Sequence, residues 1–434
     1  MKDSKLRVIL RHTALTILAL LSMALSWIIW TNPARYERSH QQVSSEKVQS
    51  SQVSHDMSDV ILPTQLIRTD SDQKQTLLAK SQVNLNQVVT DKVAKWKFES
   101  VRMVSKGNKE RYLDYAREAN SLLLKYPSNI AGGVLNEVLD QKLDFSSEVG
   151  RIVISLDKNN GVYLLNDKNY GVYQVQVSGQ DLSSLKESLT GSKRSVDVKE
   201  SILNHNLITE YQDSYQVPNY SYVINKQSNG MFSSNLLAND DSATVTTKKE
   251  KDSTVYSDVN RKQLTINKDG TARFEDYTRK GTDGNSLRAH IENGFYQLRE
   301  MGVPMDNMRF FNYTDRHDEV VFRSYVEGYP IFNDNDYGTV TVSHNNSGRV
   351  TDFSLYGLEI PVPADKKETE LPSTKMVLSQ LEATGINSDD ISDIQIGYQW
   401  TSAKGSGSTI NLTPTWYVNY KNNWYPYDQV STQG

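Results

Sequence analysis

Acid and base side chains gather most closely at residues 315–319, where the sequence reads Asp-Arg-His-Asp-Glu. A carboxylate beside an imidazole could exchange protons in general acid–base catalysis. The segment lies between two expected strands, residues 308–314 and 320–326, which together read as a hairpin. A solvated turn is therefore favoured over a catalytic site at Asp315, His317, Asp318 and Glu319.

A second polar cluster, Asn333–Gly338, reads Asn-Asp-Asn-Asp-Tyr-Gly and resembles part of a calcium-binding loop. Such a loop supplies oxygen ligands from alternating positions and needs a glycine for its bend. The downstream glutamate that would complete it is missing, and the chain runs directly into an expected strand. A polar turn is favoured over a calcium site.

The motifs of the common enzyme classes are missing from this sequence. It has no cysteine, no Gly-x-Ser-x-Gly elbow, no His-Glu-x-x-His pair and no glycine-rich phosphate or dinucleotide loop. No two of its seven histidines stand at close metal-ligand spacing. The net charge of −4 is mixed and gives no nucleic-acid footprint. We therefore expect no enzyme, no cofactor, no metal and no nucleic-acid partner.

Tyrosines are frequent near the C-terminus, across residues 398–427. They could form a platform for a carbohydrate or a peptide. Tyrosines on sheets more often pack the core or line one face, and this interpretation is favoured. The platform is kept as the alternative.

Residues 13–30, TALTILALLSMALSWIIW, form the longest stretch without charge. As a helix, eighteen residues span about 27 Å, close to the roughly 30 Å hydrocarbon core of a bilayer. Basic residues precede it at Lys2, Lys5, Arg7 and Arg11, and they favour a cytoplasmic N-terminus. The sequence predicts a single-pass protein of the cell membrane, anchored in the lipid bilayer. A cleaved signal peptide is the alternative, although the apolar run is long for one.

One stripe of this predicted transmembrane helix has the spacing of a helix–helix contact. Small residues let two helices approach closely in lipid, and a hydroxyl can form a hydrogen bond across the contact. We expect this stripe to bind a partner helix, with an ordinary anchor as the alternative. Its residues are Leu15, Ala19, Ser22, Ser26 and Ile29.

The chain divides into segments of different composition, and the predicted fold class is α+β. A cytoplasmic tail (1–12) and the transmembrane helix (13–30) precede a polar tether (31–59). An N-terminal α+β domain (60–204) follows, and then a central helix–sheet module (205–362) and a C-terminal helix–sheet module (363–434). All three of these parts are expected outside the cytoplasm.

Within the N-terminal domain the patterns predict helices at 84–103, 109–125, 129–141 and 180–190. Strands are expected at 60–68, 151–156, 161–165 and 170–177, and a strand-like segment at 230–237 begins the central module. Pro127 is expected to end the second helix. Asp181 or Ser183 is the candidate cap of the fourth helix.

The two C-terminal modules repeat one order of elements. A helix at 286–301 ends at Gly302 and precedes strands at 308–314 and 320–326. A helix at 373–384 ends at Gly385, 83 residues later, and precedes strands at 391–401 and 410–420. Each second strand is followed by an aromatic–proline turn. We interpret this as an internal duplication of a helix on an antiparallel sheet.

The order of these features resembles the YycH family. The residues that support the resemblance include Ile61-Leu-Pro63, Tyr126-Pro-Ser-Asn-Ile130, and the end of the membrane segment with Ser26, Trp27, Trp30, Pro33, Tyr36 and Glu37. The resemblance covers essentially the whole chain, although no single motif is diagnostic.

The resemblance implies an extracytoplasmic accessory regulator of the WalK/YycG sensor histidine kinase, which controls cell-wall metabolism in Gram-positive bacteria. It implies contacts between transmembrane helices and a complex with a YycI-like paralogue. It implies no catalytic residues. The alternative function is an envelope cell-wall-processing or chaperone-like factor.

Overall fold

The computed structural model describes residues 55–79, 84–157, 161–190, 194–237, 245–259, 261–279, 286–315, 318–345, 348–364, 367–403 and 408–430. The predicted tail, the predicted transmembrane helix and nearly all of the tether lie outside these ranges. Within them, no helix is long and apolar enough to cross a membrane. All of the described residues belong to one compact unit.

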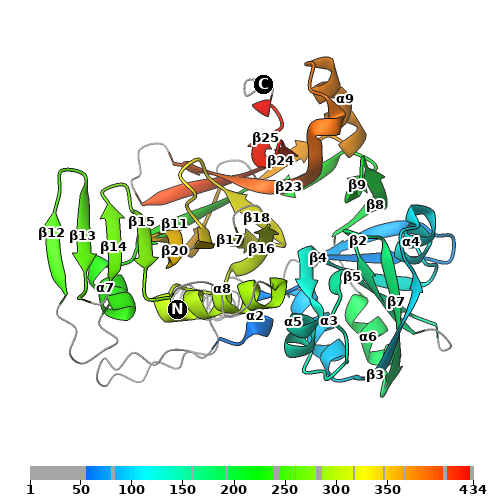
Figure 1. Cartoon of the computed structure of the whole chain (residues 1–434). Coiled ribbons are helices and arrows are strands. Elements are labelled where there is room, and N and C mark those ends of the chain that lie inside the picture. The colour runs from blue at the N-terminus through cyan, green and yellow to red at the C-terminus, as the bar shows by residue number, and fades with distance from the viewer. Residues whose placement is uncertain are drawn as a thin grey trace, which may run out of the picture. The chain divides into compact units, whose positions relative to one another are not determined.

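The first part of the chain forms a nine-stranded antiparallel sheet in the order β3-β7-β6-β5-β4-β1-β2-β8-β9 (Figure 1). Alternating or wholly apolar segments supply these strands, as expected for a sheet covered on its faces. The strands are β1 (Gln65–Thr69), β2 (Gln75–Ala79), β3 (Lys97–Ser105), β4 (Ser121–Ala131), β5 (Glu148–Ser155), β6 (Val162–Asn166), β7 (Gly171–Ser178), β8 (Arg194–Leu203) and β9 (Asn206–Tyr211).

Helices cover both faces of this sheet. Helix α4 (Lys109–Ala116) packs on β5, β6, β7 and β8, while α3 (Leu85–Ala94) packs on α6 (Leu182–Leu189). Two short helices, α2 (Met57–Val60) and α5 (Gly132–Val138), also contact each other. Asp181 caps α6 by accepting a hydrogen bond from the Ser184 backbone N–H, which confirms the predicted cap.

A fourteen-stranded sheet unites the central and C-terminal modules, and a separate pair joins β10 to β22. The parallel pairing of β18 with β23, at Ile331 and Tyr398, connects the two modules edge to edge. The strands are β10 (Tyr215–Pro218), β11 (Tyr220–Lys226), β12 (Thr246–Lys249), β13 (Ser253–Ser257), β14 (Lys262–Asn267), β15 (Thr271–Asp276), β16 (Met308–Thr314), β17 (Glu319–Val326), β18 (Tyr329–Phe332), β19 (Thr339–Asn345), β20 (Gly348–Ser354), β21 (Tyr356–Val362), β22 (Glu368–Leu371), β23 (Ile391–Ser402), β24 (Thr409–Tyr420) and β25 (Asn423–Pro426).

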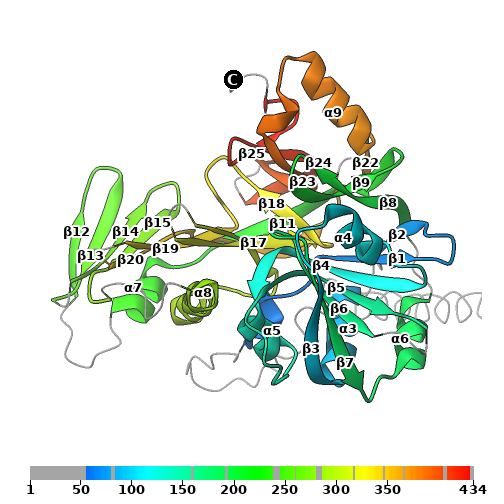
Figure 2. The same cartoon turned by 45° about the vertical axis from the view of Figure 1, so that its right-hand side comes forward.

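Three α-helices accompany these strands, and the short 3₁₀-helix η2 (Ser388–Asp390) precedes β23. Helices α7 (Asn229–Leu237) and α8 (Leu287–Met301) lie on one side of β12–β15, β19 and β20, whereas α9 (Thr374–Ala383) lies near β23 and β24 (Figure 2). The order α8-β16-β17-β18 recurs as α9-β23-β24-β25, which agrees with the predicted order of one helix and two strands. The aromatic–proline segments expected as turns are strands β18 and β25. Gly302 and Gly385, at φ 71° and 87°, end the two helices in the left-handed conformation.

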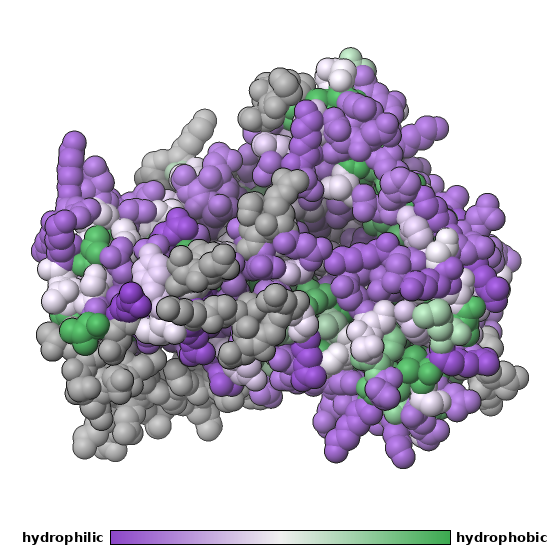
Figure 3. All heavy atoms as spheres, in the orientation of Figure 1, coloured by the Kyte–Doolittle hydropathy of each residue, from purple (hydrophilic) through white to green (hydrophobic). Residues whose placement is uncertain are grey.

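Two large apolar clusters form the core. One lies between the first sheet, α3, α5 and α6 and continues to α7 and α8, and the other joins α4 and the first sheet to α9, β23 and β24. Both clusters therefore contain residues from the N-terminal domain and from a later module. The face drawn in Figure 3 is predominantly hydrophilic, with hydrophobic residues in small separate patches.

Several predicted elements differ from the structure. The helix expected at 84–103 ends at Ala94, and β3 begins at Lys97. The helix expected at 109–125 ends at Ala116, and the next residues form the buried strand β4, which contains Pro127. The segment 230–237, expected as a strand, is helix α7, and 60–68 contains the end of α2 before β1.

The reason in each case is tertiary packing. Residues 121–131 are buried along most of their length, and the proline lies where the register of β4 with β5 shifts between Lys125 and Ile130. A bulge is one of the few places at which a sheet accepts proline. The helical spacing of the apolar residues in this region was thus outweighed by strand pairing on both sides of β4.

Candidate functional site

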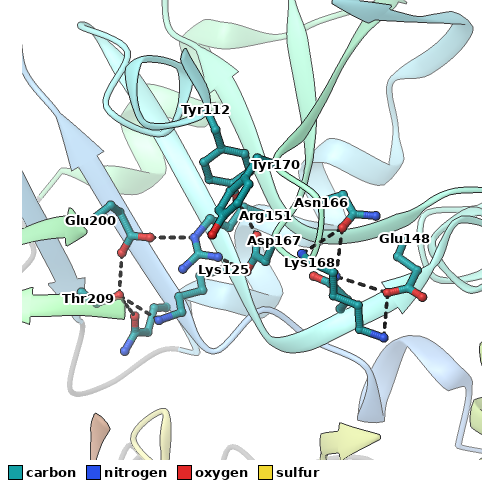
Figure 4. Close-up of polar contacts among 12 residues, drawn as sticks. Tyr112, Lys125, Glu148, Arg151, Asn166, Asp167, Lys168, Tyr170, Glu200 and Thr209 are labelled. Atoms are coloured by element: carbon teal, nitrogen blue, oxygen red, sulfur yellow. Dashed lines mark hydrogen bonds and ion pairs between the residues drawn. The ribbon is translucent and has the colours of Figure 1, made fainter. Parts of the chain in front are cut away.

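The most unusual chemical feature of the N-terminal domain is a fully buried arginine, Arg151 of β5. Its Nε donates to Oε2 of Glu200 on β8 at 2.6 Å, and Glu200 is itself fully buried. A second carboxylate, Asp167 from the turn after β6, pairs with the other side of the guanidinium (Figure 4). Two carboxylates thus neutralise one buried cation, as a buried charge requires.

Hydrogen bonds extend this arrangement towards β9 and β1. Thr209 donates to Glu200 Oε1 at 2.5 Å, and Lys125 of β4 donates to Thr209 Oγ1 at 2.9 Å. Lys125 is the register partner of Arg151 in the sheet, so two cations stand side by side on adjacent strands. Burial lowers the pKa of Lys125, while the nearby Glu200 favours its charged form.

The pKa of Glu200 reflects a contest between burial and charge. Burial alone would raise it, but the neighbouring cations Arg151 and Lys125 and the hydrogen bond from Thr209 outweigh burial, so the pKa is lowered. The carboxylate therefore stays ionised at neutral pH. The same ion pair raises the pKa of Arg151 despite its burial.

A second arm of the network leads to the central module. The Tyr112 hydroxyl donates to Asp167, and the next residue, Lys168, lies 3.3 Å from Glu148 and 3.9 Å from Asp315 at the end of β16. These last contacts are largely exposed, so they contribute little energy by themselves. They mark where the first sheet meets the central module, beside the packing of β4 on β16 and of α5 on α8.

A third set of contacts joins the first sheet to the C-terminal module. Asn204 donates to the backbone carbonyls of Ser388 and Ile391 at 2.6 and 3.1 Å, and the Tyr211 backbone N–H donates to Thr374 at 2.9 Å. Asp393 on β23 lies in the field of Lys125, and burial raises the pKa of Asp393. We name the whole set around Arg151, Glu200, Asp167, Lys125 and Thr209 the polar junction.

The contacts of the polar junction fix the positions of the strands that supply them. Both of its carboxylates are paired with Arg151, and its one hydroxyl bridges Lys125 and Glu200. Such a buried network specifies one arrangement of the strands that supply it. Of those strands, β4 packs on β16, and β8 and β9 pack on β23, so the junction holds surfaces on which the two later modules pack.

The residues predicted from sequence as candidate sites differ in where they lie. The stripe Leu15, Ala19, Ser22, Ser26 and Ile29 lies outside the described residues, as does His317. Asp315 is exposed, but Asp318 accepts a hydrogen bond from the Tyr313 hydroxyl at 3.0 Å and lies 3.6 Å from His290. The expected solvated turn is therefore partly a contact with a buried cluster.

Asn333–Gly338 is a polar turn, as favoured. The Asn333 side chain accepts from the Asn335 backbone N–H at 2.8 Å and donates to the Trp400 carbonyl at 3.1 Å, so its oxygen already has a partner. Among the described residues, no group of three or more histidine or carboxylate side chains is placed to hold a metal ion.

The C-terminal tyrosines are mainly core residues. Tyr398, Tyr417 and Tyr420 are 0%, 3% and 5% exposed. Tyr417 stacks on Phe332 with ring centroids 3.9 Å apart, which again joins the two modules. The alternative prediction of an exposed platform is therefore wrong for these three rings.

Sequence reasoning did not single out the polar junction. One signal was available: Lys125 and Arg151 each stand as a lone cation beside a run of apolar residues, Leu-Leu-Leu before Lys125 and Ile-Val-Ile after Arg151. A charge within a buried strand is costly unless it is paired. The partners Glu200 and Asp167 had no comparable signal.

The fold defines a mixed α+β protein whose modules share apolar clusters and polar contacts. Residues 9–193 match the family model described as the N-terminal domain of YycH protein, and residues 206–433 match its C-terminal domain. The chain belongs to the YycH family. Membership in this regulatory family supports a role as a regulator of the WalK/YycG system in general.

A solved structure is similar to this chain in fold. The crystal structure of YycH from Bacillus subtilis is similar over 86% of this chain and 98% of that one, with 15% sequence identity and a TM-score of 0.69. An uncharacterized protein from Eubacterium rectale covers 54% of this chain and 85% of its own, with 12% identity and a TM-score of 0.32, too low to indicate a shared fold. No curated protein matches the chain in sequence.

Proposed function

We propose that this chain is a membrane-anchored accessory regulator of a WalK/YycG-like sensor histidine kinase. The observation that carries the proposal is membership in the YycH family through both of its domains, residues 9–193 and 206–433. The anchor is the uncharged segment 13–30, with the basic tail in the cytoplasm and the folded modules outside. The chain acts by contact and carries out no chemical step.

The contact with the kinase is assigned to the stripe Leu15, Ala19, Ser22, Ser26 and Ile29. Small residues on one side of a membrane helix set the closest distance to a partner helix. A YycI-like paralogue is the proposed partner of the extracytoplasmic modules. The polar junction supports this role, because a binding surface built from three modules needs those modules held in one arrangement.

Site-specific photo-crosslinking in living cells tests the proposal. A crosslinking amino acid at Ser22 or Ser26 should capture the kinase, whereas the same group at Ile17 or Leu20, on the opposite side of the helix, should capture it much less. Equal capture from both sides, or capture of an envelope enzyme in place of the kinase, would contradict the proposed regulator.

A further inference from the structure

Two histidines meet where helix α8 packs on the second sheet. His290, in the first turn of α8, is 1% exposed, and its ring lies 5.1 Å from that of Tyr313 on β16 and 5.6 Å from that of His344 on β19. The Nδ1 atoms of both imidazoles are buried and lack a hydrogen-bond partner among the described residues. A buried imidazole in this state is neutral, since a charged one would leave a costly unpaired donor.

The nearest counter-charge is Asp318. Its Oδ1 lies 3.6 Å from His290 Nε2 and accepts a hydrogen bond from the Tyr313 hydroxyl at 3.0 Å. The backbone of Asp318 forms a hydrogen bond with His344, and Asp315 lies further along the same turn. Asp318 is half exposed, so water weakens its attraction for the buried rings.

The other charged groups near His290 and His344 lie around Arg349 on β20. Its Nη2 lies 3.7 Å from Asp276 on β15 and 3.3 Å from Glu300 on α8, and Arg279 reaches Glu300 at 3.5 Å. Both carboxylates are therefore already committed to arginines. Arg349 itself disfavours a positive charge on His344.

Burial lowers the pKa of both histidines, which are neutral at pH 7. For His344 the pKa falls to about 4. Burial disfavours the charged form of the ring, and the positive charges of a protonated His290 and of Arg349 disfavour it further. For His290 burial outweighs the attraction of Asp318 and Asp315. Acid would place two charges on rings whose centroids are 5.6 Å apart.

Helix α8 also contacts the N-terminal domain. It packs on α5 and β4, and Arg288 on α8 approaches Gly133 of α5. The strand that carries Tyr313 leads to Asp315, which faces Lys168 at 3.9 Å. If α8 loosens from the sheet, the contact between the N-terminal domain and the central module therefore loosens too.

We propose that the adjacent pair of His290 and His344 is an acid-sensitive lock that holds α8 on the second sheet and against the N-terminal domain. The direction follows from linkage. In the unfolded or locally opened chain the histidines titrate near pH 6.5, while in the closed state they resist protonation. The closed state is therefore fully stable above about pH 6.5 and loses stability as the pH falls towards 4.

Hydrogen exchange measured by mass spectrometry on the full-length chain in detergent tests the lock. After correction for intrinsic exchange rates, opening of α8 and β19 should increase about tenfold between pH 7.5 and pH 5.5, from the titration of His344 alone. Exchange in α3 and β3, which are remote from the pair, should change little. An unchanged α8 in the wild type would overturn the proposal.

Variants separate the lock from general acid sensitivity. His344→Gln, alone or with His290→Gln, should abolish most of the pH response of α8, even if it raises exchange at both pH values. The matched control is His205→Gln, because His205 is exposed and lies outside the cluster. A response in His344→Gln as large as in the wild type would also overturn the proposal.

Discussion

Arg151 and Glu200 form a fully buried ion pair, with Nε and Oε2 2.6 Å apart, although 49 residues separate them in the sequence. The pair crosses from β5 to β8 over the strands β4, β1 and β2 that lie between them in the sheet. This short contact thus holds β5 and β8 together across the three strands between them, in the sheet on which the later modules pack.

Breaking this pair should destabilise the fold strongly. Arg151→Met leaves Glu200 and Asp167 without their shared cation, and removal of one partner from a buried pair costs roughly 3–5 kcal/mol. Adding Glu200→Gln should recover part of the loss. Urea unfolding measures both changes.

The matched control is the exposed pair of Lys74 and Asp197, whose atoms are 2.7 Å apart. Lys74→Met should leave the unfolding midpoint nearly unchanged, because water screens exposed charges. Similar losses of stability in the two variants would show that the buried Arg151 pair contributes no more to the free energy of unfolding than an exposed pair does.

Acid should weaken the contribution of Glu200. Its pKa is lowered in the folded protein, so the stabilisation is present above the unfolded pKa of about 4.3 and is lost as the pH falls through the folded pKa. Unfolding free energies measured between pH 6 and pH 3 should therefore fall more steeply in the wild type than in Glu200→Gln. Parallel curves would contradict this assignment.

Asp393 should behave in the opposite sense. Burial raises its pKa, so its contribution is favourable below the unfolded pKa of about 3.9 and is lost as the pH rises through the folded pKa. Asp393→Asn should therefore raise stability at pH 7 and change it less at pH 4. A variant that is less stable than the wild type at pH 7 would show that the pairing with Lys125 outweighs burial.

The two helix-ending glycines offer a matched comparison of backbone strain. Alanine at Gly302 or Gly385 would be held at positive φ, which costs about 1 kcal/mol. At Gly302 the added Cβ would also lie 2.6 Å from Nδ2 of Asn235, whereas nothing lies within 4 Å at Gly385. Gly302→Ala should lower the free energy of unfolding more than Gly385→Ala, and equal effects would contradict the contact with Asn235.

The local patterns of this sequence predicted elements well where one face is buried and turn residues bound the segment. Strands β5, β6 and β7, the cap of α6, and the ends of α8 and α9 at Gly302 and Gly385 were found in this way. Each depends on residues that are close in sequence, which is the information that a pattern contains.

The rest depended on contacts between distant residues. Residues 121–131 became strand β4 because β1 and β5 pair with it on both sides, which no local pattern specifies. The polar junction requires β8 to lie beside β2, where the Glu200 backbone N–H donates to Gln75 at 2.8 Å across 125 residues. Arg151 could be noticed as a lone buried charge, but its partners could be found only from the strand order.

Removal of the first 34 residues should leave a soluble protein without disulfides. The mean hydropathy of the chain is −0.58, it has no cysteine, and the uncharged segment 13–30 would be gone. Size-exclusion chromatography should give a single species that does not change on reduction. Aggregation of this fragment would contradict the division into an anchor and polar extracytoplasmic modules.

The proposed contact with the kinase rests on the stripe of the transmembrane segment, and kinase-dependent reporter output tests it most directly. Ser22→Leu or Ser26→Leu should change the output, because steric separation of the helices adds to the loss of a hydrogen bond worth about 0.6 kcal/mol. Ile17→Leu and Leu20→Ile, on the opposite side, should leave it unchanged at matched membrane levels. Equal output from all four variants would contradict regulation through this helix contact.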